Sequence, residues 1–416
     1  MAKNIFFIFL SIHLSSLKNT IDKSYDSYIT LKISGSGNKI IINNTWYGAN
    51  KPDEIYIDEE IQTNINYIYD LKPENTVKLV WKNKIKNCYE MFHSCNEIIE
   101  INLAHFDSSL VTQMNRMFWD CTNLVSVDLS NLDTSKVENF GQMFENCYSL
   151  ISLDISHFNT AKAWNIGTMF CNCRTLKSLN VSNFDTSQVQ YFDKVFNGCS
   201  NLTSINLSNF KTSKAIKMEK MFKDCISLKY IDVRHFDATH ITKIDDMFSG
   251  CISLISLDFS MIDLSKVSNI DDMKNIFNNC NNLEYLNIKN YDPSKYLENN
   301  DFFPDTSKSI VVCSKKINAL IDIIEEQKCN IIICENGVEN SICTENCTMN
   351  NHQDFYKSKC YLRNSNKTFN YSYICLAFNN EETPFRLMYT QECVNKCPIK
   401  YIINKIYIFN YSNLEE

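Results

Sequence analysis

The chain has 416 residues, long enough for two or three domains, and 44% of them are hydrophobic, which is sufficient for a packed core. Its formal net charge of -7 is mild and gives no indication of the basic stripe that nucleic-acid binding requires, so we expect no nucleic-acid partner. The 19 cysteines are unusually many for a cytosolic protein and indicate an oxidising compartment, a repeated structural role, or both.

The N-terminus has the pattern of a secretory leader. Lys3 supplies a positive charge, residues 5–12 are apolar, and the chain becomes polar around Lys18. We therefore predict a signal peptide over residues 1–20; the alternative is a buried N-terminal strand or helix. No later stretch reaches the roughly 18 apolar residues of a membrane span. The expected location is secreted or cell-surface, with membrane attachment only through an anchor not visible in this chain.

Residues 21–76 alternate between apolar and polar side chains. Strands are predicted over residues 29–33, 39–42 and 54–58, with Gly35 and Gly37 in the first connecting turn. We interpret this region as a small antiparallel, β-rich cap, because an array of stacked repeats needs its first unit covered.

A 26-residue repeat dominates the middle of the chain. Cysteines at a constant spacing of 26 mark it: Cys95, Cys121, Cys147, Cys173, Cys199, Cys225 and Cys251. Cys280 follows after 29 residues. A Met-Phe pair precedes most of these cysteines, and aliphatic side chains recur three, six and eight positions after them. We predict about eight units within residues 77–292.

Each unit has the pattern of a strand, a turn and a helix. Residues 124–130 alternate as in a strand, and Ser135 with Glu138 fits a capping box. Val137, Phe140 and Met143 would then share one face of a short helix. The predicted fold class is an α/β solenoid, a leucine-rich-repeat-like array of strand-turn-helix units.

The repeat Met-Phe-x-x-Cys-x-x-Leu-x-x-Leu-Asp-Leu-Ser-x-Phe-Asp-Thr-Ser-x-Val resembles that of the BspA-like leucine-rich-repeat surface proteins, over residues 82–292. Similar arrays occur in parasitic protists, and the Asn- and Ile-rich composition is typical of an AT-rich genome. The resemblance implies an exported surface protein, with some relatives binding host matrix proteins or other cells, and no catalysis. This chain departs from the pattern at Val195 and in the insertion before Cys280.

The C-terminal part of the chain loses the repeat. Residues 293–334 fit a β-α-β cap, and residues 335–416 form a predicted cysteine-rich module stapled by disulfides. The disulfide candidates are Cys313, Cys329, Cys334, Cys343, Cys347, Cys360, Cys375, Cys393 and Cys397. Their number is odd, so one thiol is free or pairs outside the module. A zinc site is the weaker alternative, because the short spacings are C-x-x-x-C.

The cysteine column of the repeat allows two interpretations. Stacked thiols could form disulfides or bind metal, but parallel stacking points their Cβ atoms the same way, which disfavours bridging. We predict buried free thiols that serve the repeat core: Cys121, Cys147, Cys173, Cys199, Cys225 and Cys251. His105, His157 and His235 share a column with asparagines, where either side chain can bond the backbone at a turn. No metal or cofactor is expected.

The outward strand positions form a polar, weakly acidic face. It is either a solvated surface or a binding surface for a protein or glycan. The binding hypothesis assigns Asp128, Asp154, Asp232, Asp258, Tyr230, Arg234, Tyr285 and Lys289. Glycosylation sequons at Asn180 and Asn206 fall on the same face, and glycans there would weaken that hypothesis.

The function expected from these features is adhesion or recognition through an extracellular protein or glycan ligand. No HExxH, GxSxG, P-loop or GxGxxG motif occurs, so we do not expect an enzyme. The alternatives are a structural coat protein without a foreign ligand, and a secreted enzyme with an unrecognised site.

Overall fold

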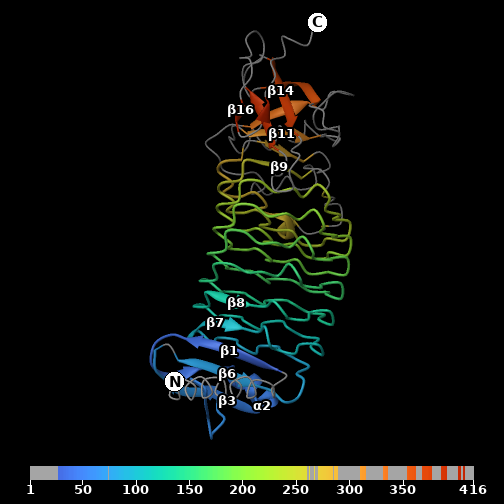
Figure 1. The fold of residues 1–416 in the computed structure, drawn as a ribbon. Coiled ribbons are helices and arrows are strands. Elements are labelled where there is room, and N and C mark those ends of the chain that lie inside the picture. The colour runs from blue at the N-terminus through green and yellow to red at the C-terminus, as the bar shows by residue number, and fades with distance from the viewer. Residues whose placement is uncertain are drawn as a thin grey trace, which may run out of the picture.

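The computed structural model describes residues 27–73, 75–259, 262, 267, 270–283 and 285–288, and the backbone of further strands between residues 310 and 407. In Figure 1 the N-terminal strands lie at one end of a long stack of coils, and the later strands lie at the other. The predicted leader, residues 1–20, lies outside the described residues, as does most of the predicted cysteine-rich module.

The N-terminal cap is a sheet that continues into the first coils. Its strand order is β4-β3-β6-β1-β7-β8. The members are β1 (Tyr28–Ile33), β3 (Glu54–Ile57), β4 (Glu60–Ile61), β6 (Thr76–Val80), β7 (Ile98–Asn102) and β8 (Ser126–Asp128). β1 lies antiparallel between β6 and β7, whereas β7 and β8 are parallel. Ile29, Leu31 and Ile33 of β1 are buried, so alternate side chains of the cap cover the end of the stack.

Smaller elements complete the cap. β2 (Gly37–Ile40) pairs with β5 (Ile68–Leu71). Helix α2 (Asn44–Asn50) begins at Asn43, whose side chain accepts hydrogen bonds from the amides of Thr45 and Trp46. The Trp46 indole donates to the carbonyl of Asn87 at 3.0 Å, which ties the cap to the first coil.

The predicted α/β solenoid of strand-turn-helix units is wrong. Where the repeat predicted helices, the chain forms consecutive turns, and α2 and the 3-10 helix η1 (Ile270–Met273) are the helices among the described residues. None of the helices in this part of the chain is long and apolar enough to span a lipid bilayer. Residues from 114 to 121 show the reason, because their amides alternate between two kinds of partner.

The amides of Met114, Arg116, Phe118 and Asp120 bond carbonyls on the next coil, 25 residues later. The amides between them, at 117, 119 and 121, bond the carbonyl three residues back. An α-helix needs bonds to the residue four back, so this pattern excludes it. It is a series of β-turns whose spare amides hold the coils together.

Left-handed residues separate these turns. Each coil has two positive-φ positions four residues apart, for example Arg116 at 60° and Asp120 at 58°. The second position directly precedes the cysteine: Ser94, Asp120, Asn146, Asn172, Gly198, Asp224, Gly250 and Asn279. Gly, Asn and Asp tolerate this conformation best. A left-handed residue cannot continue a right-handed helix, so the local sequence selects turns.

The side of each coil on which a strand was predicted, here called the strand side, forms paired β-strands mainly at the two ends of the stack. The side that carries the consecutive turns is called the turn side. β9 (Ser256–Asp258) is parallel to β10 (Tyr285–Asn287). They begin a sheet of order β9-β10-β11-β12-β13-β14-β15. The further strands are β11 (Ile310–Ser314), β12 (Ile331–Glu335), β13 (Asp354–Tyr361), β14 (Thr368–Leu376) and β15 (Arg386–Thr390), with a separate pair β16 (Ile402–Ile403) and β17 (Ile406–Tyr407). Bridges on the turn side join successive coils from Asn87 to Lys243 in steps of 26 residues, and they continue through the coils between β8 and β9.

Two columns of side chains run through the core beside buried Leu, Ile, Val and Met side chains. Phenylalanine rings stack from coil to coil, with centroids 5.8 Å apart for Phe92 and Phe118 and 5.2 Å for Phe118 and Phe144. The repeat cysteines form the second column. Each coil alone could not bury these side chains, so stacking is the source of the core.

Candidate functional site

The structure places the repeat-core cysteines in the buried interior as free thiols. From Cys121 onward, each column thiol donates to a phenylalanine carbonyl on the preceding coil, for example Cys121 to Phe92 at 3.0 Å and Cys173 to Phe144 at 3.2 Å. Burial raises the pKa of these thiols well above the ordinary cysteine value. A buried, protonated thiol is a poor nucleophile and a poor metal ligand, so this column supports packing.

Two carboxylates of the predicted binding face hold the backbone. Asp128 and Asp154 are exposed, and each accepts a hydrogen bond at 3.0 Å from the amide two residues later. The hydroxyl and amide of Ser156 also lower the pKa of Asp154. These Asx turns fix the corner of the coil, which gives the two side chains a structural role that their column position did not reveal.

The other assigned residues lie farther along the stack. Asp232 accepts from the amide of Arg234 and forms a bidentate pair with its guanidinium, at 3.0 and 2.8 Å. Tyr230 and Asp258 are partly buried. Tyr285 lies in β10, where its side chain is not described, and Lys289 is outside the described residues. Arg234 is thus already engaged within its own coil.

The disulfide candidates fall in the later strands or beyond the described residues. Strand register places Cys313 opposite Cys334, and Cys334 opposite Cys360. Cys375 lies in β14. Cys329, Cys343, Cys347, Cys393 and Cys397 are outside the described residues. The pairing of these cysteines stays a prediction.

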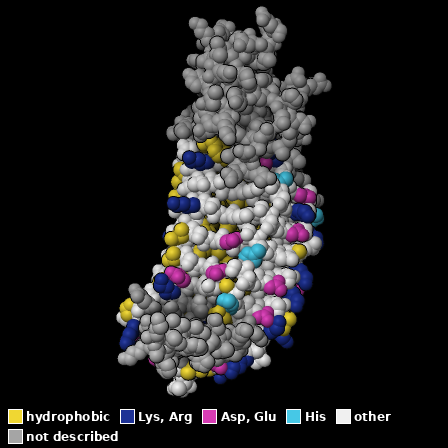
Figure 2. Space-filling model, viewed as in Figure 1, with side chains coloured by type: hydrophobic (Ala, Val, Ile, Leu, Met, Phe, Trp, Pro, Cys, Tyr) yellow, Lys and Arg dark blue, Asp and Glu magenta, His cyan; other side chains and the backbone are white. Residues whose placement is uncertain are grey.

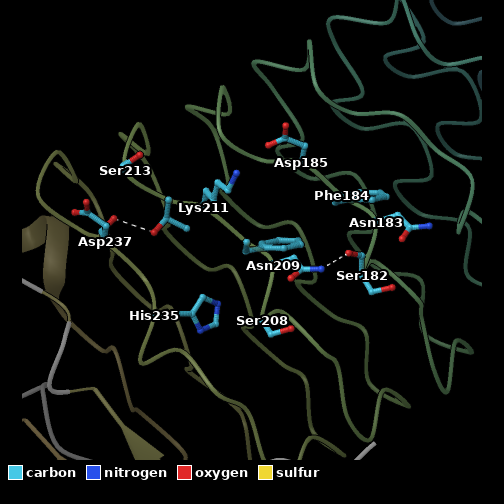
Figure 3. A pocket seen from close by; sticks show the side chains of 12 residues that line it. Ser182, Asn183, Phe184, Asp185, Ser208, Asn209, Lys211, Ser213, His235 and Asp237 are labelled. Atoms are coloured by element: carbon cyan, nitrogen blue, oxygen red, sulfur yellow. Dashed lines mark hydrogen bonds between the residues drawn. The ribbon is translucent and has the colours of Figure 1, made fainter. Parts of the chain in front are cut away.

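A groove of about 670 Å³ crosses three coils at the corner between the strand side and the turn side. Asp185, Lys211 and Asp237 line it from successive coils, with His235 beside them (Figure 3). The rings of Phe184 and Phe210 stack 6.5 Å apart and are almost fully buried, so they form its floor.

The corner is built from short polar bonds between coils. Buried Thr186 accepts from the amide of Lys211 at 2.7 Å and donates to its carbonyl at 3.0 Å. The side-chain Nδ2 of Asn209 donates to the carbonyl of Ser182 at 2.6 Å. His235 occupies the equivalent position one coil later, and its Nε2 lies 2.7 Å from the carbonyl of Leu207, so Nε2 must be the donor.

Lys211 is the residue at this corner that departs from the repeat. The equivalent positions hold carboxylates or an amide: Asp107, Asp133, Asn159, Asp185 and Asp237. Each of these accepts a hydrogen bond from the amide two residues later. A lysine has no acceptor and cannot form this turn. Its presence is therefore not required by the fold.

The groove carries both signs of charge. Hydrogen bonds from Ser187 lower the pKa of Asp185, and those from Thr239 lower the pKa of Asp237, so both are ionised at neutral pH. The Lys211 ammonium lies between these two coils, and Figure 3 shows it directed toward the side of Asp185. Hydroxyls of Ser208 and Ser213 add further donors and acceptors.

Lys211 was not predicted as a site residue from the sequence. The available signal was the break in a column of Asp and Asn, which becomes meaningful once those residues are known to form turns. Among the described residues, no group of three or more His, Cys, Asp or Glu side chains is arranged to hold a metal ion. On the face shown in Figure 2, hydrophobic side chains follow one margin of the stack together with several Lys or Arg side chains, and charged residues of both signs follow the opposite margin.

Comparisons with known proteins give one match. The family model described as "Mycoplasma protein of unknown function, DUF285" matches residues 86–181, 168–270 and 254–310. Together these ranges span residues 86–310, which is 225 of the 416 residues. No curated protein and no solved structure matches the chain. The coils described above coincide with the matched region, and the chain belongs to the DUF285 family.

Proposed function

We propose that this protein is an exported recognition protein that binds an extracellular protein or glycan at the Lys211 groove. The observation that carries the proposal is Lys211 itself. In neighbouring coils the equivalent side chain stabilises the corner, whereas here a cation occupies the corner on the coil between those of Asp185 and Asp237. A residue that gives up a repeated structural bond is best explained by a role outside the stack.

The groove suits a polar ligand. Its rim offers acceptors on two carboxylates, a donor on Lys211 and hydroxyls on Ser208 and Ser213. Its backbone is fixed by bonds to both neighbouring coils, so little conformational entropy is lost when a ligand binds. The leader pattern at residues 1–20 supports export, and the resemblance to BspA-like surface proteins supports recognition at a cell surface.

The test is binding of the full chain to arrays of matrix proteins and oligosaccharides, with K211E and K162E measured in parallel. Lys162 is also an exposed lysine at a coil corner, so K162E controls for net charge. We expect K211E to weaken binding at least roughly tenfold, about 1.4 kcal/mol, and K162E to leave it unchanged. Equal effects of the two variants, or no bound ligand on either array, would contradict the proposal.

A structural coat protein is a second candidate, favoured by exposed apolar side chains on one margin. Val125 and Ile151 occupy equivalent positions on adjacent coils and are 36% and 60% exposed. Rods packed side by side would cover them. Concentration-dependent assembly of the purified chain, lost in I151Q, would favour this candidate, whereas a monomer at all concentrations would exclude it.

A further inference from the structure

Trp164 is a large aromatic side chain exposed on the turn side of the stack. It is 40% exposed, whereas Trp46 and Trp81 are 5% and 3% exposed and donate their indole N–H groups to carbonyls. The equivalent positions of other coils hold Lys86, Thr112, Glu138, Gln190, Ile216 and Thr242. The stack therefore does not need an aromatic residue there.

The backbone of Trp164 is held on both sides. Its amide donates to the carbonyl of Glu138 at 3.0 Å, and its carbonyl accepts from the amide of Gln190 at 2.9 Å. The indole meets the Tyr191 ring edge to face, with centroids 5.7 Å apart and an interplanar angle of 77°. A tryptophan fixed in this way presents a rigid apolar surface at low entropic cost.

Two glycines on the turn side allow side chains of the following coils to pack over them. Gly141 and Gly167 do not have a positive φ, so their backbone conformation does not demand glycine. What excludes a side chain is space: a Cβ on Gly141 would lie 2.6 Å from Asn165 Nδ2, and one on Gly167 would lie 2.9 Å from Asp193 Oδ1. The Asn165 side chain therefore lies over the preceding coil, close to Trp164 in the chain.

The same column holds Glu138 on the preceding coil and Gln190 on the following coil, so the neighbouring positions along the stack carry a carboxylate and an amide. Asn139 and Asn165 accept from the amides of Gly141 and Gly167, so their side-chain N–H groups are not used in those two bonds. The Lys217 ammonium lies 5.8 Å from the centroid of the Tyr191 ring that the indole contacts. An apolar ring face bordered by polar side chains of both signs matches a neutral sugar, which has an apolar C–H face and hydroxyls at its edge.

We propose that Trp164 is a stacking platform for a pyranose ring of a neutral oligosaccharide. The inference goes beyond the proposed function, because it adds a carbohydrate site on an earlier coil than the Lys211 groove. A protein partner fits less well, because its anchor would need an apolar rim to exclude water, whereas the same column holds the polar residues Glu138 and Gln190 on the two adjacent coils. The Lys211 groove lies on later coils, so the two sites can be tested separately.

The test is fluorescence titration of the full chain with cellohexaose, laminarihexaose and chitohexaose. Binding over an exposed indole removes it from water, so we expect a saturable blue shift of the tryptophan emission with one of these probes. W164Q should abolish the shift and lower the affinity, measured by calorimetry, at least roughly tenfold. Gln is the residue of the next coil at this position, so the stack accepts it.

The matched control is I151Q, which removes another exposed apolar side chain and should leave sugar binding unchanged. No shift with any probe, or a shift retained in W164Q, overturns the platform. If a ligand of the arrays is lost in K211E but retained in W164Q, the proposed function stands and this inference fails. If no ligand is found on the arrays and no sugar binds, both fail.

Discussion

At the scale of single residues, the buried polar groups of each coil form hydrogen bonds with the neighbouring coil. The thiol of Cys147 donates to the carbonyl of Phe118 at 3.3 Å, and the hydroxyl of Thr160 donates to the carbonyl of Asp185 at 3.1 Å. Such bonds satisfy buried carbonyls that would otherwise be costly. A polar side chain is therefore a candidate for a functional role only when it takes no part in these hydrogen bonds between coils.

The buried thiols predict low reactivity. Burial raises the pKa of Cys171 to about 12, so almost none of it is the reactive thiolate at pH 8. Peptide mapping after iodoacetamide treatment of the native protein should find Cys171 and the core column from Cys95 to Cys280 unlabelled. The same cysteines should label fully in guanidinium chloride. Native labelling at the rate of a free thiol would show that the column is accessible.

The buried carboxylate of Glu219 is expected to lower the stability of the folded protein in a pH-dependent way. Glu219 is 9% exposed, and its Oε2 has no hydrogen-bond partner. Burial, with the nearby charge of Asp193, raises the pKa of Glu219 above its usual value. The folded protein then disfavours the ionised form. The penalty is full at neutral pH, and it disappears as the pH falls through the raised folded pKa to below the unfolded value near 4.5.

E219Q should therefore be more stable than the wild type at pH 7, by up to about 1 kcal/mol, and equal to it below pH 4. Urea unfolding at both pH values measures the difference. E138Q is the control, because Glu138 is exposed and should give no change at either pH. A destabilised E219Q at pH 7 would mean that the carboxylate has a favourable partner.

At the scale of elements, the 26-residue period was predicted correctly from the sequence, but the helix predicted in each unit is wrong. Val137, Phe140 and Met143 are buried as predicted, yet their spacing arises from successive turns. A run of β-turns buries the same positions as a helical face, so hydrophobic periodicity cannot separate the two structures. The left-handed column of Ser, Asp, Asn and Gly before each cysteine could have done so.

Strands were easier to predict in the cap than in the coils. β1 and β3 coincide with alternating segments that have turn residues at their ends. Residues 152–154 have the same alternation but no strand, because their coils pair chiefly along the turn side. Which side of a coil carries the ladder depends on stacking, and one sequence unit does not encode it locally.

Substitution of Gly250 distinguishes a turn from a helix, because the change in the free energy of unfolding has opposite signs in the two structures. Gly250 has a φ of 76°, and an added Cβ would overlap the Asp224 carboxylate. G250A should lower the free energy of unfolding by ~1–3 kcal/mol. In a helix the same change would raise it by about 1 kcal/mol. Denaturant unfolding decides, and G250N should be milder than G250A, because Asn146 and Asn172 adopt this conformation in other coils.

At the scale of the whole molecule, each coil can be compared with the other coils at equivalent positions. Every coil shows which side chains stacking requires, so departures such as Lys211 and Trp164 become visible without any related sequence. The assigned face of Asp128, Asp154 and Arg234 could not be judged from the sequence, because the internal bonds of these side chains appear only when the corners are folded.

The most direct test compares K211N with the wild type in two measurements. One is the affinity for the ligand that the arrays identify, and the other is the free energy of unfolding. Asn159 occupies the equivalent corner and caps its turn, so Asn at 211 should add the missing bond and keep or raise stability by about 1 kcal/mol. The account predicts that K211N is at least as stable as the wild type and binds at least roughly tenfold more weakly. Unchanged binding by a fully folded K211N would contradict it.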